Sequence, residues 1–119
     1  NMKIEVVKGD VSDTYMFKRT DDNGETIKTL PKKMWITFKK GVWCKKCLCQ
    51  KTLENKKITY SEEDNYYRFR LESDDTNNLD YDTYYFDIAI LNEQGEKKTL
   101  LNNGELVILT HYTDKDNEV

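Results

Sequence analysis

The three cysteines of the chain lie within six residues, at Cys44, Cys47 and Cys49 in the segment WCKKCLCQK. Thiolates at this spacing could ligate a metal ion or exchange a disulfide bond. A structural zinc site needs four ligands, and the single histidine, His111, would have to come from a distant strand. Cys44, Cys47, Cys49 and His111 are therefore the zinc candidates of the sequence, although we expect neither a metal nor another cofactor.

A packing role is a simpler explanation of the cysteines, because it requires no ligand from a distant strand. Cys47, Cys49 and Leu53 share the same parity on an expected strand, and a free cysteine behaves as a small buried hydrophobic residue. Cys44 would then lie in the preceding loop. A redox Cys-x-x-Cys motif normally opens a helix in an α/β fold, and no such pattern surrounds this one. We therefore expect buried structural thiols.

Acidic side chains are the other candidates for chemistry, and most of them fall in segments that are typical of turns. They cluster at 62–64 and 74–82, where aspartate supports turn geometry by accepting hydrogen bonds from nearby backbone. Their spacing does not match an EF-hand loop, and the sequence has no nucleophile elbow or phosphate-binding glycine loop. We therefore expect a protein that is not an enzyme.

Aromatic side chains on the outside of the expected strands indicate a binding surface instead. The alternation in MWITFKK (34–40) turns Trp35 outward, and the same parity turns Tyr66 and Tyr85 outward, while Trp43 falls in a loop. Exposed aromatic residues give a large contact area with few rotatable bonds, and interfaces are enriched in them. Trp35, Trp43, Tyr66 and Tyr85 are therefore the interface candidates.

Strand patterns dominate the elements that must position these residues. Asn23-Gly24 predicts a hairpin, and Asn102, Asn103 and Gly104 predict the turn of a last hairpin. Eight or nine short strands separated by frequent turn signals indicate an all-β sandwich or a small barrel. The candidate segments from which these strands are drawn are 3–8, 14–20, 27–30, 34–40, 47–53, 58–60, 66–72, 83–91, 97–101 and 105–113.

The segment DTNNLDYDTYYFDI (75–88) favours a sandwich of the immunoglobulin (Ig) type. A polar connection with an apolar anchor at Leu79 leads into a strand that begins with tyrosines, as in a tyrosine corner. Tyr81 or Tyr84 would be the corner residue. We expect one Ig-like antiparallel β-sandwich domain of about eight strands over residues 2–113. A frayed charged tail is expected at 114–119.

Composition limits the classes of partner. The 119 residues include eight Tyr, four Phe and two Trp, which argues against disorder. The net charge of −3 and pI near 5.2 offer no overall basic surface for nucleic acid. No apolar signal-peptide region follows NMKIEVVKGD, and no apolar run approaches the ~20 residues of a membrane span. We expect synthesis in a cytoplasm and no membrane partner.

The order of these segments resembles the Ig-like β-sandwich domains encoded by phages and prophages of Gram-positive bacteria. The chain is similar in particular to the N-terminal domain of the baseplate upper protein family, over nearly its whole length. The resemblance is carried by GD (9–10), TYMF (14–17), MWITFKK (34–40), CQKTL (49–53), ITYSEEDNYYRF (58–69), the segment 75–88 and NGELVILT (103–110). The cysteine cluster departs from that pattern.

The resemblance implies a virion structural or assembly module of a phage tail, baseplate or neck. Such a module would be made in the host cytoplasm without a signal peptide. It would dock on other phage structural proteins or on copies of itself, and it would be part of the virion. A second interpretation comes from the outward aromatic residues, since sandwiches that bind carbohydrate stack sugar rings on Trp and Tyr. Residues 35, 43, 66 and 85 would then form the sugar-binding strip of a carbohydrate-binding module.

Overall fold

The structure is a computed structural model and describes residues 2–113. The charged tail expected at 114–119 lies outside the described residues. The expected all-β class is confirmed, with eight strands and one short helix in the described part of the chain. In chain order the elements are β1 (Lys3–Val7), β2 (Tyr15–Phe17), β3 (Lys33–Lys39), β4 (Cys49–Thr52), β5 (Thr59–Tyr60), β6 (Tyr67–Phe69), α1 (Ser73–Thr76), β7 (Thr83–Leu91) and β8 (Lys97–Leu109).

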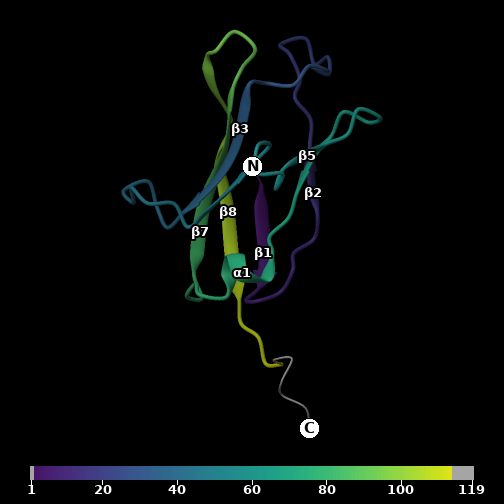
Figure 1. The fold of residues 1–119 in the computed structure, drawn as a ribbon. Helices are drawn as coiled ribbons and strands as arrows, with labels where there is room; N and C mark the ends of the chain where they lie inside the picture. The colour runs from purple at the N-terminus through teal and green to yellow at the C-terminus, as the bar shows by residue number, and fades with distance from the viewer. Residues whose placement is uncertain (1, 114–119) are drawn as a thin grey trace.

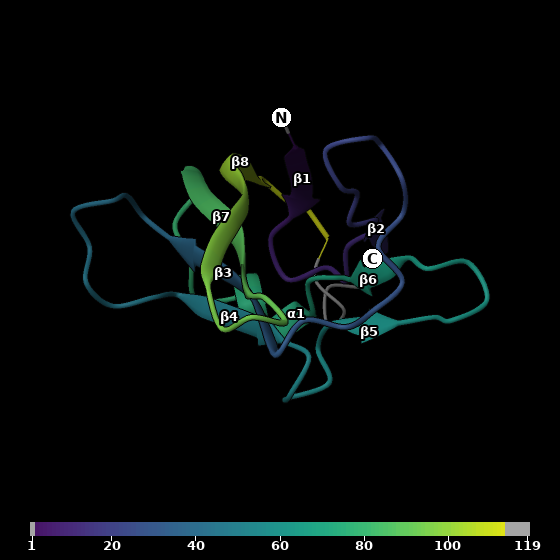
Figure 2. The ribbon, with the colours of Figure 1, turned by 90° about the horizontal axis from the view of Figure 1, so that it is seen from above.

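The strands form two sheets that face each other in a curled, half-barrel arrangement (Figures 1 and 2). The larger sheet has the order β1-β8-β7-β3-β4, and the smaller sheet has the order β2-β6-β5. All neighbouring strands are antiparallel except β1 and β8, which run parallel from the pair Lys3 and Glu105 to the pair Val7 and Leu109. The expected wholly antiparallel architecture is therefore wrong. Parallel neighbours cannot share a tight turn, and here nearly the whole domain separates the first strand from the last.

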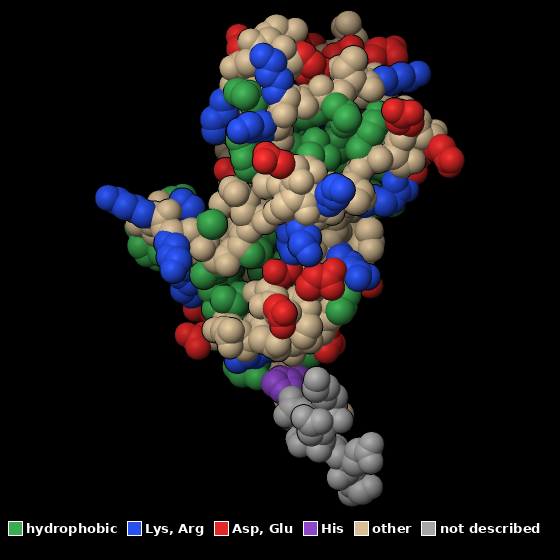
Figure 3. Space-filling view, in the orientation of Figure 1, with side chains coloured by type: hydrophobic (Ala, Val, Ile, Leu, Met, Phe, Trp, Pro, Cys, Tyr) green, Lys and Arg blue, Asp and Glu red, His purple; other side chains and the backbone are tan. Residues whose placement is uncertain are grey.

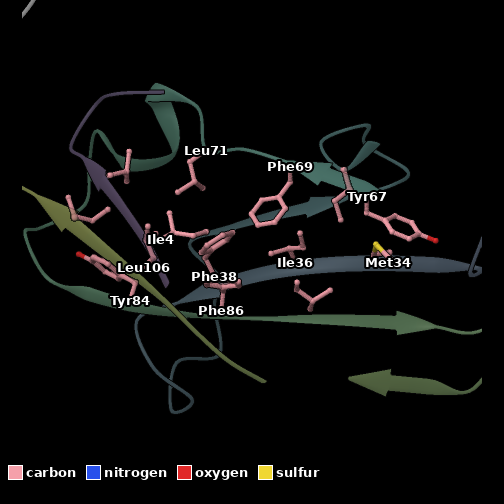
Figure 4. Packing of buried hydrophobic residues seen from close by; sticks show 14 of the residues in the cluster. Ile4, Met34, Ile36, Phe38, Tyr67, Phe69, Leu71, Tyr84, Phe86 and Leu106 are labelled. Carbon is pink, nitrogen blue, oxygen red and sulfur yellow. The ribbon is translucent and has the colours of Figure 1, made fainter. Parts of the chain in front are cut away.

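Alternating apolar residues form the core between the sheets, as the period of two predicts. On β7 the side chains of Tyr84, Phe86, Ile88 and Ile90 are buried, and positions 34, 36 and 38 of β3 are buried beside them. Figure 4 shows Tyr67, Phe69 and Leu71 pointing at this layer from the β6 side. The Phe38 and Phe86 ring centroids lie 4.9 Å apart, so aromatic packing joins β3 to β7.

The last hairpin predicted around Asn102–Gly104 is wrong, because residues 97–109 form one continuous strand. In the pairing of β7 with β8, Phe86 lies opposite Gly104 and Ile88 lies opposite Leu101, with a shift of register between them. Asp87 therefore faces two residues, Asn102 and Asn103, which is a β-bulge rather than a turn. Gly104 is buried under Phe86, where an added Cβ would lie 2.5 Å from the ring.

Other local predictions have mixed outcomes. The hairpin at Asn23-Gly24 is confirmed by a bridge between Thr20 and Thr26 and by a φ of 78° at Gly24. The strand expected at 27–30 is absent, and the expected polar connection after β6 contains the single turn of α1. The Tyr84 hydroxyl donates a hydrogen bond to the Asp80 carbonyl at 2.9 Å, which is the backward bond expected of a corner tyrosine. No helix among residues 2–113 has both the length and the apolar character to cross a membrane.

Candidate functional site

The structure does not assemble the four zinc candidates into a group that could hold a metal ion. Cys44 and Cys49 are partly buried and Cys47 is exposed, while His111 follows β8 with its Nδ1 atom 3.2 Å from the Tyr81 hydroxyl. Within the described part of the chain, no group of three or more His, Cys, Asp or Glu side chains is placed to hold a metal ion. These residues therefore do not form one site.

The prediction that Cys47 packs on a strand is wrong. Residues 41–44 form a turn closed by the Cys44 N–H and the Gly41 carbonyl at 3.0 Å, and pairing with β3 begins only at Cys49, opposite Phe38. Cys47 thus lies in the loop between β3 and β4, where its side chain is exposed to solvent. Sequence parity could not show where strand pairing starts.

Cys49 behaves as the packing interpretation expects. Burial and, to a smaller extent, the Asp75 carboxylate raise the pKa of its thiol to about 12 against the opposing effect of Lys51. Because the thiolate is the nucleophile and the metal-binding form, this thiol is unreactive at neutral pH.

An open groove of about 470 Å³ lies on the outer face of the larger sheet. Two of the predicted interface residues, Trp35 on β3 and Tyr85 on β7, line it together. Trp35 lies opposite Ala89 in the sheet, and the small alanine leaves room above it. The lining residues are Trp35, Thr37, Lys39, Gly41, Val42, Gln50, Tyr85, Phe86, Asp87, Ala89, Lys97 and Asn102.

The third predicted aromatic residue, Trp43, lies beside this groove on the loop between β3 and β4. A Cβ added at Gly41, which lines the groove, would clash with the Trp43 ring, so the indole rests directly on the glycine. Trp43 is still 73% exposed and Val42 is 97% exposed. The loop projects from the body of the molecule in Figures 1 and 2, so it presents an open aromatic surface.

The fourth predicted aromatic residue, Tyr66, lies elsewhere. It precedes β6 of the smaller sheet, and the ammonium of Lys18 lies 4.6 Å from its ring centroid. Tyr66 does not line the groove. The structure therefore brings Trp35, Tyr85 and Trp43 to one region and places Tyr66 outside it.

Polar side chains surround the aromatic pair in the groove. The Gln50 amide donates to the Thr37 hydroxyl at 2.9 Å, which orders both groups along the wall formed by β4. Asp87 is the one carboxylate of the lining, whereas Lys39 and Lys97 are both cationic. Among the described residues, neither lysine forms an ion pair. The groove can therefore offer aromatic stacking, hydrogen bonds and uncompensated positive charge.

Sequence reasoning missed these polar residues for two different reasons. Thr37, Lys39 and Asp87 have the same parity as the outward aromatic residues, so the pattern contained a signal for them. Lys97 and Asn102 reach the groove only because β8 is one bulged strand, and the predicted turn at 102–104 hid that.

Comparisons with known proteins suggest neither a family nor a function for the chain. No protein-family model matches the chain, and neither the curated proteins nor the solved structures gave a match.

Proposed function

We propose that the chain is a non-enzymatic structural or assembly module of a phage virion, in the tail, baseplate or neck, that docks on other virion proteins or on copies of itself. The observation that carries the proposal is the gathering of exposed apolar side chains around the loop between β3 and β4. Val42 and Trp43 are largely exposed, and Tyr85 and Leu48 are 46% and 41% exposed beside them. Exposed aromatic and aliphatic residues that cluster in this way mark docking surfaces.

We also propose that the fold is an Ig-like sandwich. If β2 to β8 are lettered B, C, C′, D, E, F and G, the smaller sheet has the order B-E-D and the larger sheet contains G-F-C-C′. That division of strands matches the variable-type Ig arrangement, apart from β1, which pairs with β8. The hydrogen bond from Tyr84 to Asp80, at the start of strand F, supports the same fold.

The virion proposal is tested on particles of the phage or prophage that encodes the chain. We expect mass spectrometry of purified particles to detect the wild-type protein, and the double variant Val42→Ser/Trp43→Ala to be missing from them. The control Leu30→Ser removes a side chain that is 50% exposed away from the groove, and it should be incorporated normally. A wild-type protein that is expressed in the cells but absent from the particles would overturn the proposal.

The groove favours a second candidate function, carbohydrate binding. Trp35 and Tyr85 can stack on a sugar ring, while Gln50, Asp87 and Asn102 can exchange hydrogen bonds with its hydroxyl groups. Such a combination of aromatic walls and a few polar groups is typical of small-ligand sites. We expect Trp35→Ala to weaken binding on a glycan array by about tenfold, whereas the wild-type protein and Leu30→Ser bind equally.

A further inference from the structure

The volume and lining of the groove set the size and character of a ligand. About 470 Å³ falls within the range of roughly 300 to 1,000 Å³ that small-ligand sites occupy. The aromatic residues come from the neighbouring strands β3 and β7, and polar groups come from β3, β4, β7 and β8 around them. One or two sugar rings would occupy such a space.

The lining of the groove carries a charge opposite in sign to that of the whole chain. The chain carries a net charge of −3, yet the lining has two lysines and one carboxylate. Lys45 and Lys46 add two exposed cations on the projecting loop, where Figure 3 shows lysine and hydrophobic side chains together. By contrast, Lys40 and Lys51 are paired with Asp82 and Asp75.

We propose that the groove binds an acidic saccharide, that is, a sugar carrying an anionic group such as a uronate carboxylate. One ring stacks on Tyr85 with its anionic group at Lys39, which lies opposite Tyr85 in the sheet, and a second ring stacks on Trp35 with its anionic group towards Lys97. Trp43 offers its open ring face to a neighbouring sugar, with Lys45 and Lys46 beside that sugar's own acid. Lysines that have no ion-pair partner and lie next to aromatic residues favour an anionic sugar, because a neutral sugar gains no electrostatic attraction from them. The inference rests on the carbohydrate-binding candidate and specifies its ligand.

The test uses matched pairs of oligosaccharides that differ only in charge. Oligomers of galacturonate, alginate and hyaluronan are compared with their methyl-esterified, neutral forms by isothermal titration calorimetry against the full chain. We expect at least one acidic form to bind about tenfold more tightly than its ester. Lys39→Gln and Lys97→Gln should each weaken binding of that acid by about twofold to fivefold, as for exposed charge pairs, and should leave binding of the ester unchanged.

Control variants separate charge from stacking. Trp35→Ala should weaken binding of acid and ester alike, by about tenfold. Lys28→Gln removes an exposed lysine that does not line the groove, so it should change neither. Circular dichroism checks that each variant is folded.

Three other outcomes would overturn the inference. Equal binding of acids and esters would refute the charge preference and leave carbohydrate binding standing. Binding to none of the six ligands would refute the inference, and the glycan array then decides separately whether the carbohydrate-binding candidate stands. Equally tight binding of polyglutamate, which has charge but no sugar ring, would show that a polyanion suffices and that the groove recognises no saccharide.

Discussion

At the scale of single residues, the three thiols of the cysteine cluster are chemically unequal. Cys47 is exposed in a loop, whereas Cys49 begins β4 with its pKa raised to about 12 by burial. We expect iodoacetamide at neutral pH to alkylate Cys47 rapidly and Cys49 only in urea. Peptide mass spectrometry of timed samples measures both rates, and the unfolded protein serves as the control in which the rates converge. Equal labelling of the two residues in the folded protein would contradict this expectation.

A second residue-scale prediction concerns Asp64. The Arg68 guanidinium hydrogen-bonds both carboxylate oxygens, at 2.5 and 3.3 Å, and the Tyr66 N–H adds a third bond, which lowers the pKa of Asp64 to about 2. The folded state therefore binds this proton more weakly than the unfolded state, whose carboxyl has a pKa of about 3.9. The stabilisation is present above pH ~4 and is lost as the pH falls towards about 2.

Asp64→Asn should accordingly lower the urea midpoint at about pH 6 and have little effect near pH 2. Glu62→Gln, in the same turn, is the matched control, because Glu62 forms no ion pair among residues 2–113. The expectation is refuted if Asp64→Asn destabilises the protein equally at the two pH values.

At the scale of elements, the bulge in β8 connects core packing to the groove. Gly104 is opposite Phe86, whose ring occupies the space of a side chain there. The two residues before it, Asn102 and Asn103, are looped out opposite Asp87, and Asn102 thereby reaches the groove. The register of the N-terminal half of β8, including Lys97, therefore depends on this bulge and on a second irregularity at Leu100, between the pairs Ile88–Leu101 and Ala89–Thr99.

Gly104→Ala should cost about 2 kcal/mol of unfolding free energy, because overpacked sites in a core typically cost roughly 1–3 kcal/mol. Asn103→Ala, an exposed change in the same bulge, should alter the free energy of unfolding by less than about 0.5 kcal/mol. Urea denaturation followed by tyrosine and tryptophan fluorescence measures both. An unchanged midpoint for Gly104→Ala would show that Phe86 can move aside freely.

At the scale of the whole molecule, two ion pairs join segments that belong to different sheets. Lys51 on β4 of the larger sheet pairs with Asp75 on α1, which follows β6 of the smaller sheet. Arg19, just after β2, pairs with Glu93 in the turn between β7 and β8 at 3.1 Å. The Lys51 and Arg19 side chains are 4% and 5% exposed, so both cations are buried between the layers.

Breaking one of these pairs should be costly, since it leaves a buried charge without its partner. We expect Lys51→Met to lower the unfolding free energy by about 3 kcal/mol. The double variant Lys51→Met/Asp75→Asn should recover much of that loss, because the amide oxygen introduced at position 75 can still accept the Glu72 N–H that Asp75 accepts now. A double-mutant cycle in urea gives the coupling energy, and additive effects of the two changes would refute the expected coupling.

The sequence by itself determined the features that depend on neighbouring residues. Alternation at positions 34–38 and 84–90 specified which side chains are buried, because successive residues of a strand point to opposite faces. The same alternation predicted that the side chains of Trp35 and Tyr85 point outward. Asn23-Gly24 specified a hairpin because glycine tolerates positive φ, and the corner bond of Tyr84 spans only four residues.

Only the tertiary structure decided the features that depend on distant segments. The parallel pairing of β1 with β8 and the ion pair of Lys51 each join residues from separate parts of the chain, so no local pattern contains them. The Asn102–Gly104 segment has the composition of a turn, yet it became a bulge because the Phe86 ring packs against Gly104. This bulge and the second irregularity at Leu100 together decided that Lys97 and Asn102 complete the groove around the aromatic pair.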